Sequence, residues 1–241
     1  MRKYLSLYLL LFLATFTFAQ DNNPNRTSAV INGNLQVGIP LDEFADNLDA
    51  LGFGAGGLLA FRIKNSPIYA GIELSGMIYD SQTDRYSVNI GGFIEEYDLR
   101  TSNSIFLGHF LLRIMPDIDF PVKPYIDGMI GTKNLYTRTK LIDINDVEPD
   151  EQSRIEEGDW AFSYGGAFGL QISISKKDNA FLDLRCAYLP GTNASYLVRR
   201  EADETVSYEE PIDAFERKNS ATLLLMPQIG VTFTIGSSDM E

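Results

Sequence analysis

The sequence predicts an all-β fold, an eight-stranded antiparallel up-and-down transmembrane β-barrel, on three observations. Eight segments alternate apolar side chains with polar or small ones at a period of two, as strands with one apolar face do. Short and long connections alternate between these segments. Past the first 19 residues, no apolar run approaches the roughly 20 residues that a membrane helix needs. Because only helices and closed barrels satisfy their backbone groups in hydrocarbon, membrane insertion must use the strands.

The first residues predict export. Two cations precede an apolar run over about residues 4–18, and the small residues Thr17 and Ala19 stand where a signal peptidase would cut. We therefore expect residues 1–19 to be a removed signal peptide and residues 20–241 to form one barrel domain. The apolar run is short for a retained membrane anchor.

The first half of the mature chain supplies four strands. They are predicted at Ala29–Ile39, Gly52–Ile63, Ile68–Tyr79 and about Ser104–Ile114. In the first strand the odd positions are apolar, whereas the even positions include Asn32, Asn34 and Gln36. The fourth strand is less regular and places His109 and Arg113 on the inner face beside two leucines.

The second half supplies four more. They are predicted at Pro124–Tyr136, Trp160–Ser175, Ala180–Tyr188 and about Ala221–Ile235. The sixth strand is the most regular, since large apolar residues alternate there with glycine, alanine, serine and glutamine. In the seventh, Asp183 and Arg185 share one face and Leu182 and Leu184 the other. Eight strands close a barrel without a free edge.

The connection lengths predict the orientation. The short turns are 64–67, 115–122 and 176–179, and the long connections are 40–51, 81–103, 137–158 and 193–220. Outer-membrane barrels keep short turns in the periplasm and long loops outside, so we expect an outer-membrane protein with both termini in the periplasm. Aromatic residues near the strand ends predict two girdles. Their members are Phe53, Tyr79, Tyr136, Trp160, Phe162 and Tyr188 at the outer rim, and Phe61, Phe120, Tyr125 and Phe233 at the inner rim.

Four segments of the mature chain carry a family resemblance. They read VGIPLDEF and GFGAGG around the first long connection, PYIDGMIG in the fifth strand and FLDLRCAYLPG in the seventh. With them the chain resembles the small outer-membrane β-barrel proteins of Gram-negative bacteria, broadly of the OmpA/OmpX type. The resemblance implies a membrane-embedded scaffold that serves adhesion, structural support or no assigned role. Many relatives end on an aromatic residue that is recognised during assembly, whereas this chain continues past Phe233.

Charged residues on the inward faces form the candidate site. Four cations, Arg62, Arg113, Lys133 and Arg185, oppose three acids, Glu73, Asp127 and Asp183. Unpaired charges would be costly in a barrel just wide enough for side chains. We therefore expect a network of ion pairs and hydrogen bonds that plugs the lumen. The alternative is a narrow, gated conduit for water or small ions.

Two other functions would fit a barrel of this kind. A lipid-modifying outer-membrane enzyme would have to use His109, the only histidine, and the sequence places no serine and carboxylate with it. A secreted, soluble barrel that carries an apolar ligand would have the faces reversed.

GFGAGG at 52–57 fits GxGxxG, but it opens a strand rather than a helix. We expect no catalytic, cofactor-binding or metal-binding residues, and interpret the acidic segment 143–159 as a solvated loop rather than a calcium site.

The expected partners are outer-membrane lipid and an extracellular or cell-surface partner that binds the long loops. The formal net charge of −13 becomes −15 once the two cations of the signal are removed, which argues against a nucleic-acid partner.

The helical spacing in 40–51 predicts a short amphipathic helix over the barrel mouth or along the outer membrane surface. Segment 81–103 predicts a hairpin above the membrane. The single cysteine, Cys186, excludes an intramolecular disulfide, and we expect a monomer.

Overall fold

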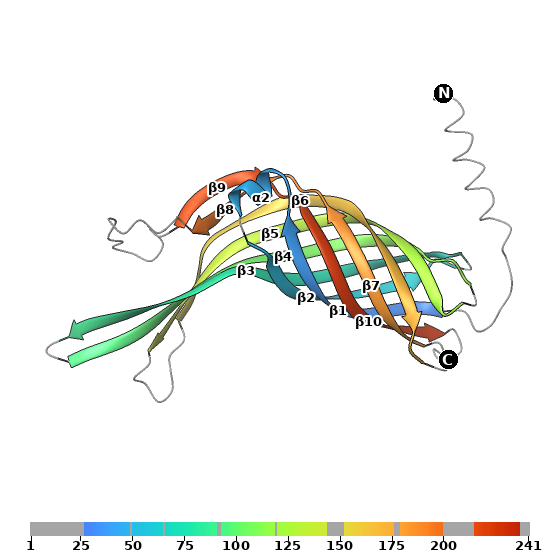
Figure 1. Ribbon diagram of the computed structural model, residues 1–241, viewed down its shortest axis with the longest axis horizontal. Coiled ribbons are helices and arrows are strands. Elements are labelled where there is room, and N and C mark those ends of the chain that lie inside the picture. The colour runs from blue at the N-terminus through green and yellow to red at the C-terminus, as the bar shows by residue number, and fades with distance from the viewer. Residues whose placement is uncertain are drawn as a thin grey trace, which may run out of the picture.

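The strands of the chain close into a barrel, as the sequence predicts. The computed structural model describes residues 27–48, 50–64, 66–90, 93–118, 120–143, 152–175, 179–199 and 215–236. Its barrel strands are β1 (Thr27–Pro40), β2 (Gly52–Arg62), β3 (Ile68–Ile90), β4 (Phe93–Ile114), β5 (Val122–Asp143), β6 (Gln152–Ser173), β7 (Ala180–Leu189) and β10 (Leu224–Gly236). They form one antiparallel closed sheet in the order β1-β10-β7-β6-β5-β4-β3-β2 (Figure 1). The predicted signal peptide lies outside the described residues.

Alternation along the strands sends apolar side chains outward and polar ones inward. Leu35, Phe53 and Phe110 are more than 60% exposed on the outer surface, whereas Gln36, Glu73 and Arg113 are at most 3% exposed in the interior. The soluble carrier with reversed faces is therefore contradicted, because its aliphatic rows would line a central cavity. Among the described residues, no helix has the length and apolar character needed to cross a bilayer.

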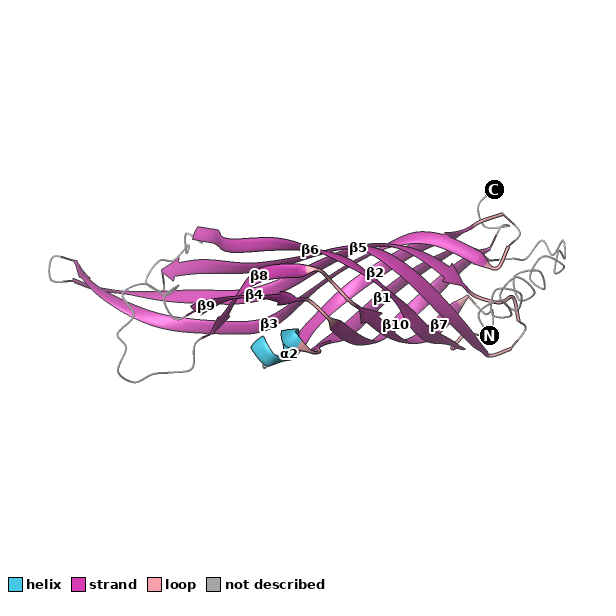
Figure 2. Cartoon of the chain, turned by 90° about the horizontal axis from the view of Figure 1, so that it is seen from above, coloured by secondary structure: helices cyan, strands magenta, loops and turns pink. Residues whose placement is uncertain are grey.

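Four strands run beyond the closed part of the barrel. The pairing of β2 with β3 ends at Phe53 and Ile78, and the pairing of β6 with β7 ends at Gly166 and Tyr188. Beyond these points β3, β4, β5 and β6 continue to pair with one another as an extended sheet (Figures 1 and 2). Gly165 has a φ of +152° where β6 separates from β7, a conformation that favours glycine.

The extended sheet corrects the predicted strand ends. The hairpin expected within 81–103 is present as the outer parts of β3 and β4. The outer parts of β5 and β6, in contrast, occupy much of 137–158, for which the sequence predicts a loop. The sequence of these strand ends, which lie beyond the closed barrel, lacks the apolar alternation from which strands are predicted.

A helix and a hairpin lie at the same end of the barrel as the extended sheet. The predicted helix is α2 (Glu43–Asn47). Segment 193–220 is not a plain loop, because β8 (Asn193–Arg199) and β9 (Phe215–Ala221) pair as a separate two-stranded sheet. The hairpin β8–β9 packs against β5, β6 and α2, and the rings of Phe44 and Tyr196 meet edge to face with centroids 5.2 Å apart.

The predicted aromatic girdles need two corrections. Trp160, Phe53 and Phe61 are exposed on the outer surface as expected. Tyr79 and Tyr125, however, are 6% and 2% exposed and lie on inward faces. Both occupy odd positions of strands whose odd residues point inward, so alternation outweighs proximity to a strand end.

Candidate functional site

A chain of ion pairs crosses the barrel interior. Arg113 Nε and Nη2 donate to the two carboxylate oxygens of Asp127 at 2.8 and 2.9 Å. Arg185 Nε donates to Asp127 at 3.0 Å, and its Nη1 and Nη2 donate to the two oxygens of Glu73 at 2.7 and 2.9 Å. All four side chains are at most 4% exposed. Two guanidinium groups and two carboxylates therefore neutralise each other within one buried cluster.

Neighbouring side chains fix the geometry of these pairs. The Oε1 atom of Gln228 accepts from Arg185 Nη1 at 2.7 Å. The guanidinium carbon of Arg113 lies 3.7 Å from the centroid of the Tyr125 ring. The bidentate pairs Arg113–Asp127 and Arg185–Glu73 combine charge with directional hydrogen bonds. Together these contacts join the inward side chains of β3, β4, β5, β7 and β10.

Asp183 belongs to a second branch that contains no cation. It accepts hydrogen bonds from the Tyr125 hydroxyl at 2.6 Å, from the Thr232 hydroxyl at 2.7 Å and from the Gln171 amide at 3.3 Å. Asn32 donates in turn to Thr232 at 2.8 Å. Three neutral donors thus replace the ion pair that the sequence led us to expect for this carboxylate.

Lys133 occupies the other end of the interior, near the hairpin. Its ammonium nitrogen, on a fully buried residue, donates to the backbone carbonyl of Leu189 at 2.7 Å and to that of Thr222. These carbonyls belong to the end of β7 and to the segment just before β10. Lys133 therefore joins the two chain segments that lead into and out of the hairpin β8–β9.

Arg62 lies apart from the other predicted network residues. It pairs with Asp117 in the short turn between β4 and β5 at 2.5 Å and donates to the Tyr69 hydroxyl at 2.6 Å. Arg62 is therefore at the turn end of the barrel. The remaining six predicted residues, three cations and three acids, are all buried in the interior.

Four buried polar atoms lack a hydrogen-bond partner among the described residues. They are Asn34 Oδ1, Gln36 Nε2, Arg113 Nη1 and Gln171 Oε1. Buried polar atoms of this kind are places where internal water binds. The barrel interior therefore contains polar atoms that could still form hydrogen bonds, next to the electrically neutral cluster of ion pairs.

His109 has a partner, Ser163, that the sequence does not reveal. Its Nε2 atom lies 2.9 Å from Ser163 Oγ, and both residues are at most 4% exposed. Glu73 is directly opposite His109 in the register of β3 and β4, but both of its oxygens accept from Arg185. Ser163 and His109 thus lie within hydrogen-bonding distance in the barrel interior. The neighbouring carboxylate of Glu73 binds Arg185 and not His109.

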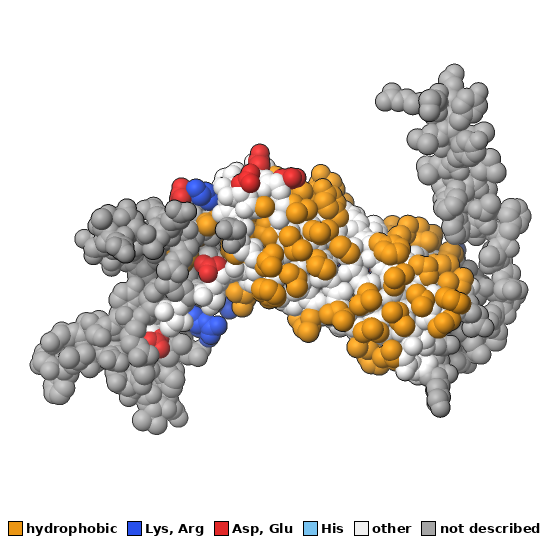
Figure 3. All heavy atoms as spheres, viewed as in Figure 1, with side chains coloured by type: hydrophobic (Ala, Val, Ile, Leu, Met, Phe, Trp, Pro, Cys, Tyr) orange, Lys and Arg blue, Asp and Glu red, His pale blue; other side chains and the backbone are white. Residues whose placement is uncertain are grey.

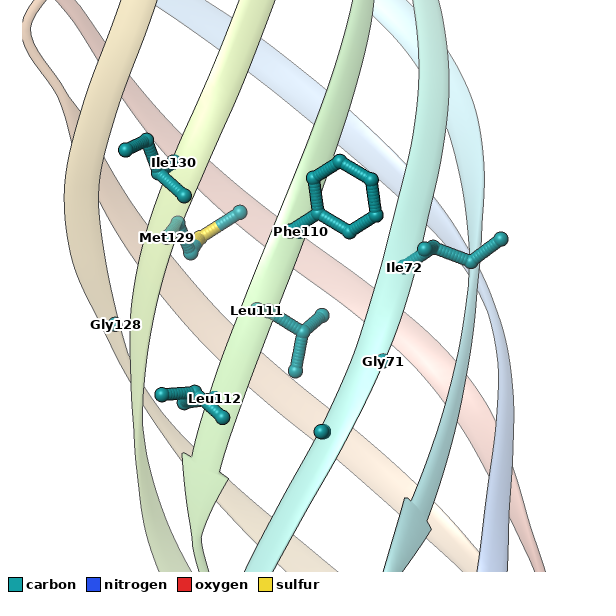
Figure 4. Close-up of a pocket in the computed structure, with 9 residues that line it drawn as sticks. Gly71, Ile72, Phe110, Leu111, Leu112, Gly128, Met129 and Ile130 are labelled. Atoms are coloured by element: carbon teal, nitrogen blue, oxygen red, sulfur yellow. The ribbon is translucent and has the colours of Figure 1, made fainter.

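The outer surface contrasts with this interior. Figure 3 shows apolar side chains gathered over the closed part of the barrel, with charged side chains beyond one end of it. An apolar groove crosses the outer faces of β3, β4 and β5, where Ile72, Phe110, Leu112 and Ile130 surround the small residues Ala70 and Gly128 (Figure 4). In the described part of the chain no group of three metal-ligating side chains occurs, and residues 144–151 of the acidic segment lie outside that part.

Comparisons with known proteins find matches of low identity among solved structures only. No protein-family model and no curated protein matches this chain. Among solved structures, neisserial surface protein A is 10% identical, with a TM-score of 0.40, and 86% of this chain aligns with 97% of that one. For OprG of Pseudomonas aeruginosa the identity is 11%, the TM-score 0.42 and the coverage 88% and 97%. A major outer membrane protein of Thermus thermophilus gives 10%, 0.44, 86% and 99%. At these values, the assignment of the fold rests on the strand pairing of this chain itself.

Proposed function

We propose that the protein is an integral outer-membrane β-barrel with a plugged lumen, which acts as a structural or surface-interaction protein. The buried ion-pair chain between opposite walls of the barrel is the observation that carries this proposal. A barrel built to conduct would leave a water-filled path along its axis, whereas here side chains from several strands meet at the centre.

The outer surface supports membrane insertion. Rows of large apolar side chains are exposed on the outer surface, among them Leu35, Phe110 and Phe168 at more than 50% exposure. In water, each Å² of this apolar surface would cost about 25 cal/mol of free energy. In a bilayer the same rows contact lipid chains. An apolar belt around a polar interior is the arrangement of transmembrane barrels.

Two features support the plug. The central cluster is electrically neutral and holds β3, β5 and β7 together. Near the mouth, the Lys133 ammonium binds the Leu189 and Thr222 carbonyls, and the hairpin β8–β9 packs over β5 and β6. Charge pairs inside and a packed hairpin at one end both oppose the passage of solutes.

The two unlike ends of the barrel support an orientation in the membrane. The short turns, the beginning of β1 and the end of β10 lie at the same end of the barrel. We place this end in the periplasm, as is usual for outer-membrane barrels. The extended sheet and the hairpin β8–β9 then face outward. Rigid extensions above a membrane are suited to contact other molecules, because they present loops and strand surfaces at fixed positions.

The plug is tested by conductance in planar bilayers. We expect the purified protein to insert, as judged by a different gel mobility before and after boiling, and to show no steady porin-like current. The variant Arg185→Ser serves as the comparison, because it removes the side chain that joins opposite walls. Sustained large openings of the wild-type protein would contradict the plugged lumen.

A narrow conduit for water is the second candidate, favoured by the four buried polar atoms without partners. Waters bound to Asn34, Gln36 and Arg113 would form part of such a path. Vesicles that contain the protein and undergo an osmotic step separate the two functions. Shrinkage faster than in protein-free vesicles, without ion current, would support the conduit, and equal rates would support the plug.

A further inference from the structure

The hairpin β8–β9 continues two neighbouring barrel strands across a short break. The ladder between β7 and β10 ends with Leu189 opposite Leu224. Residues 190–192 then lead from β7 into β8, and residues 222–223 lead from β9 into β10. The hairpin is therefore the outer part of the β7–β10 ribbon, and both of its strands are interrupted where it leaves the barrel.

The break lets the ribbon leave the barrel wall. The hairpin packs against β5 as well as β6, although β6 separates β5 from β7 in the barrel, and Figure 1 shows the hairpin beside α2. Gly191, which follows Pro190, makes an isolated bridge with Ser163 of β6. A β-carbon on Gly191 would overlap the hydroxyl of Thr222 on the other side of the break. Glycine thus lets the two connections approach each other closely.

Lys133 joins the two sides of this break. Its ammonium donates to the carbonyl of Leu189 at 2.7 Å and to the carbonyl of Thr222. Lys133 is on β5 and lies opposite Ala161 of β6, so its side chain reaches past β6 to the ribbon. Among the described residues, no carboxylate lies within ion-pair distance of this ammonium. The lysine therefore holds the two connections through backbone carbonyls and not through an ion pair.

Beyond the break, the hairpin is a paired unit that docks on its neighbours. Strands β8 and β9 form their own two-stranded sheet. The backbone N–H of Ser195 donates to Asp159 Oδ2 at 2.8 Å, and the rings of Tyr196 and Phe44 meet edge to face. A paired ribbon that is joined to a rigid body by two short connections has the form of a hinged element.

We infer that the strands β8 and β9 form a hinged lid at the barrel mouth, with residues 190–192 and 222–223 as the hinge and Lys133 as the latch. In the closed form the Lys133 ammonium binds one carbonyl on each side of the hinge. In the open form the hairpin leaves β5, β6 and α2 as a paired unit, and water solvates the ammonium. The inference goes beyond the proposed function, because it concerns the mouth of the barrel and not the ion pairs in its centre.

The test measures opening by the reactivity of a buried thiol in the full-length protein in detergent. Ser220 of β9 is 2% exposed, so a cysteine there, in a Cys186→Ser background, reacts with a charged methanethiosulfonate only when the hairpin opens. Lys133→Met should raise the rate constant of this reaction by about tenfold or more, because two hydrogen bonds from a charged donor are lost. Methionine also removes the cost of burying a charge, so a lid that did not depend on the latch would react more slowly.

Lys123→Met is the matched control. Lys123 is at the start of the same strand, where its ammonium lies 4.9 Å from the centroid of the Phe181 ring, and its substitution should leave the rate unchanged. Asn219→Cys, at an exposed position of β9, should react equally fast in every background. An unchanged or slower reaction of Ser220→Cys in the Lys133→Met protein would overturn the latch.

A second buried thiol separates opening of the lid from unfolding of the barrel. Ser75, on the inward face of β3, is 6% exposed, and Ser75→Cys should stay protected in the Lys133→Met protein. Loss of protection at both positions would overturn the hinge. If Lys133→Met fails to fold, Gly191→Ala replaces it, with an expected rise of about threefold, because the added carbon displaces Thr222. A closed lid in every variant would leave the conductance test of the plug unaffected, so the two proposals fail separately.

Discussion

Arg185 and Glu73 join opposite walls of the barrel through a bidentate ion pair, with Nη1 and Oε1 2.7 Å apart. Arg185 is on β7 and Glu73 on β3, and three strands separate them in either direction around the sheet. Side chains from opposite walls therefore meet in the interior at that level. This pair is therefore a structural tie across the barrel, and under the proposed function it forms part of the plug.

The first prediction concerns the stability that this tie provides. Arg185→Met leaves the Glu73 carboxylate buried without its cation, and the loss of one partner of a buried pair costs about 3–5 kcal/mol. Urea unfolding in detergent, followed by the fluorescence of Trp160, measures the change. Adding Glu73→Gln to the variant removes the orphaned charge and should recover part of the loss.

Arg217→Met is the control for this experiment. Arg217 also pairs with an acid, Glu157, at 2.7 Å, but its side chain is 68% exposed. Exposed pairs contribute less than about 1 kcal/mol, so this variant should unfold nearly as the wild type does. Equal effects of the two substitutions would contradict the account of a buried network.

The second prediction concerns the packing beneath Tyr125. Gly169 faces the Tyr125 ring so closely that a β-carbon on Gly169 would overlap it, and this ring donates its hydroxyl to Asp183. Gly169→Ala should destabilise the barrel by about 1–3 kcal/mol, since overpacking a core displaces its neighbours. Gly128→Ala, on the outer face with no atom within 4 Å of the added carbon, should be nearly neutral in the same unfolding measurement.

The third prediction concerns the docking of the hairpin at high pH. Burial raises the pKa of Tyr196 above its usual value of about 10, and its hydroxyl lies 2.7 Å from Ser220 Oγ. A group whose pKa is raised on folding stabilises the folded form fully below its unfolded pKa, and this contribution is lost as the pH rises through the folded pKa. The hairpin should therefore loosen only above about pH 10.

A spin label at Val198→Cys, in a Cys186→Ser background, reports this change as increased mobility. Tyr196→Phe keeps the ring packed against Phe44 but has no ionisable hydroxyl, so its label mobility should not change with pH over the same range. The hydrogen bond that it loses is expected to cost about 1 kcal/mol. Loosening of both proteins at the same pH would assign the effect to other groups.

Much of the barrel could be predicted because an apolar exterior around a polar interior imposes a strict alternation on each strand. The inward positions of Asp127, Asp183 and Arg185 follow from that alternation alone. The outer parts of β5 and β6, and the hairpin β8–β9, escaped prediction because strands surrounded by water have no such constraint.

The partners within the candidate site were less predictable than its members. Alternation indicates which face a side chain occupies but not its height in a tilted barrel. Ser163 and His109 meet although β5 lies between their strands, and Lys133 binds carbonyls rather than a carboxylate. Such pairings depend on strand register and tilt, which the residues of a single sequence do not reveal.

The central claim is that lipid chains solvate the apolar outer rows of the barrel, and Cys186 tests it most directly. This only cysteine points outward from β7 and is exposed. A spin label on Cys186 of the wild-type protein in phospholipid vesicles can be probed by its collisions with oxygen, which concentrates in hydrocarbon, and with a water-soluble nickel chelate. We expect high accessibility to oxygen and low accessibility to nickel. High accessibility to nickel with little contact with oxygen would place this face in water and contradict the account.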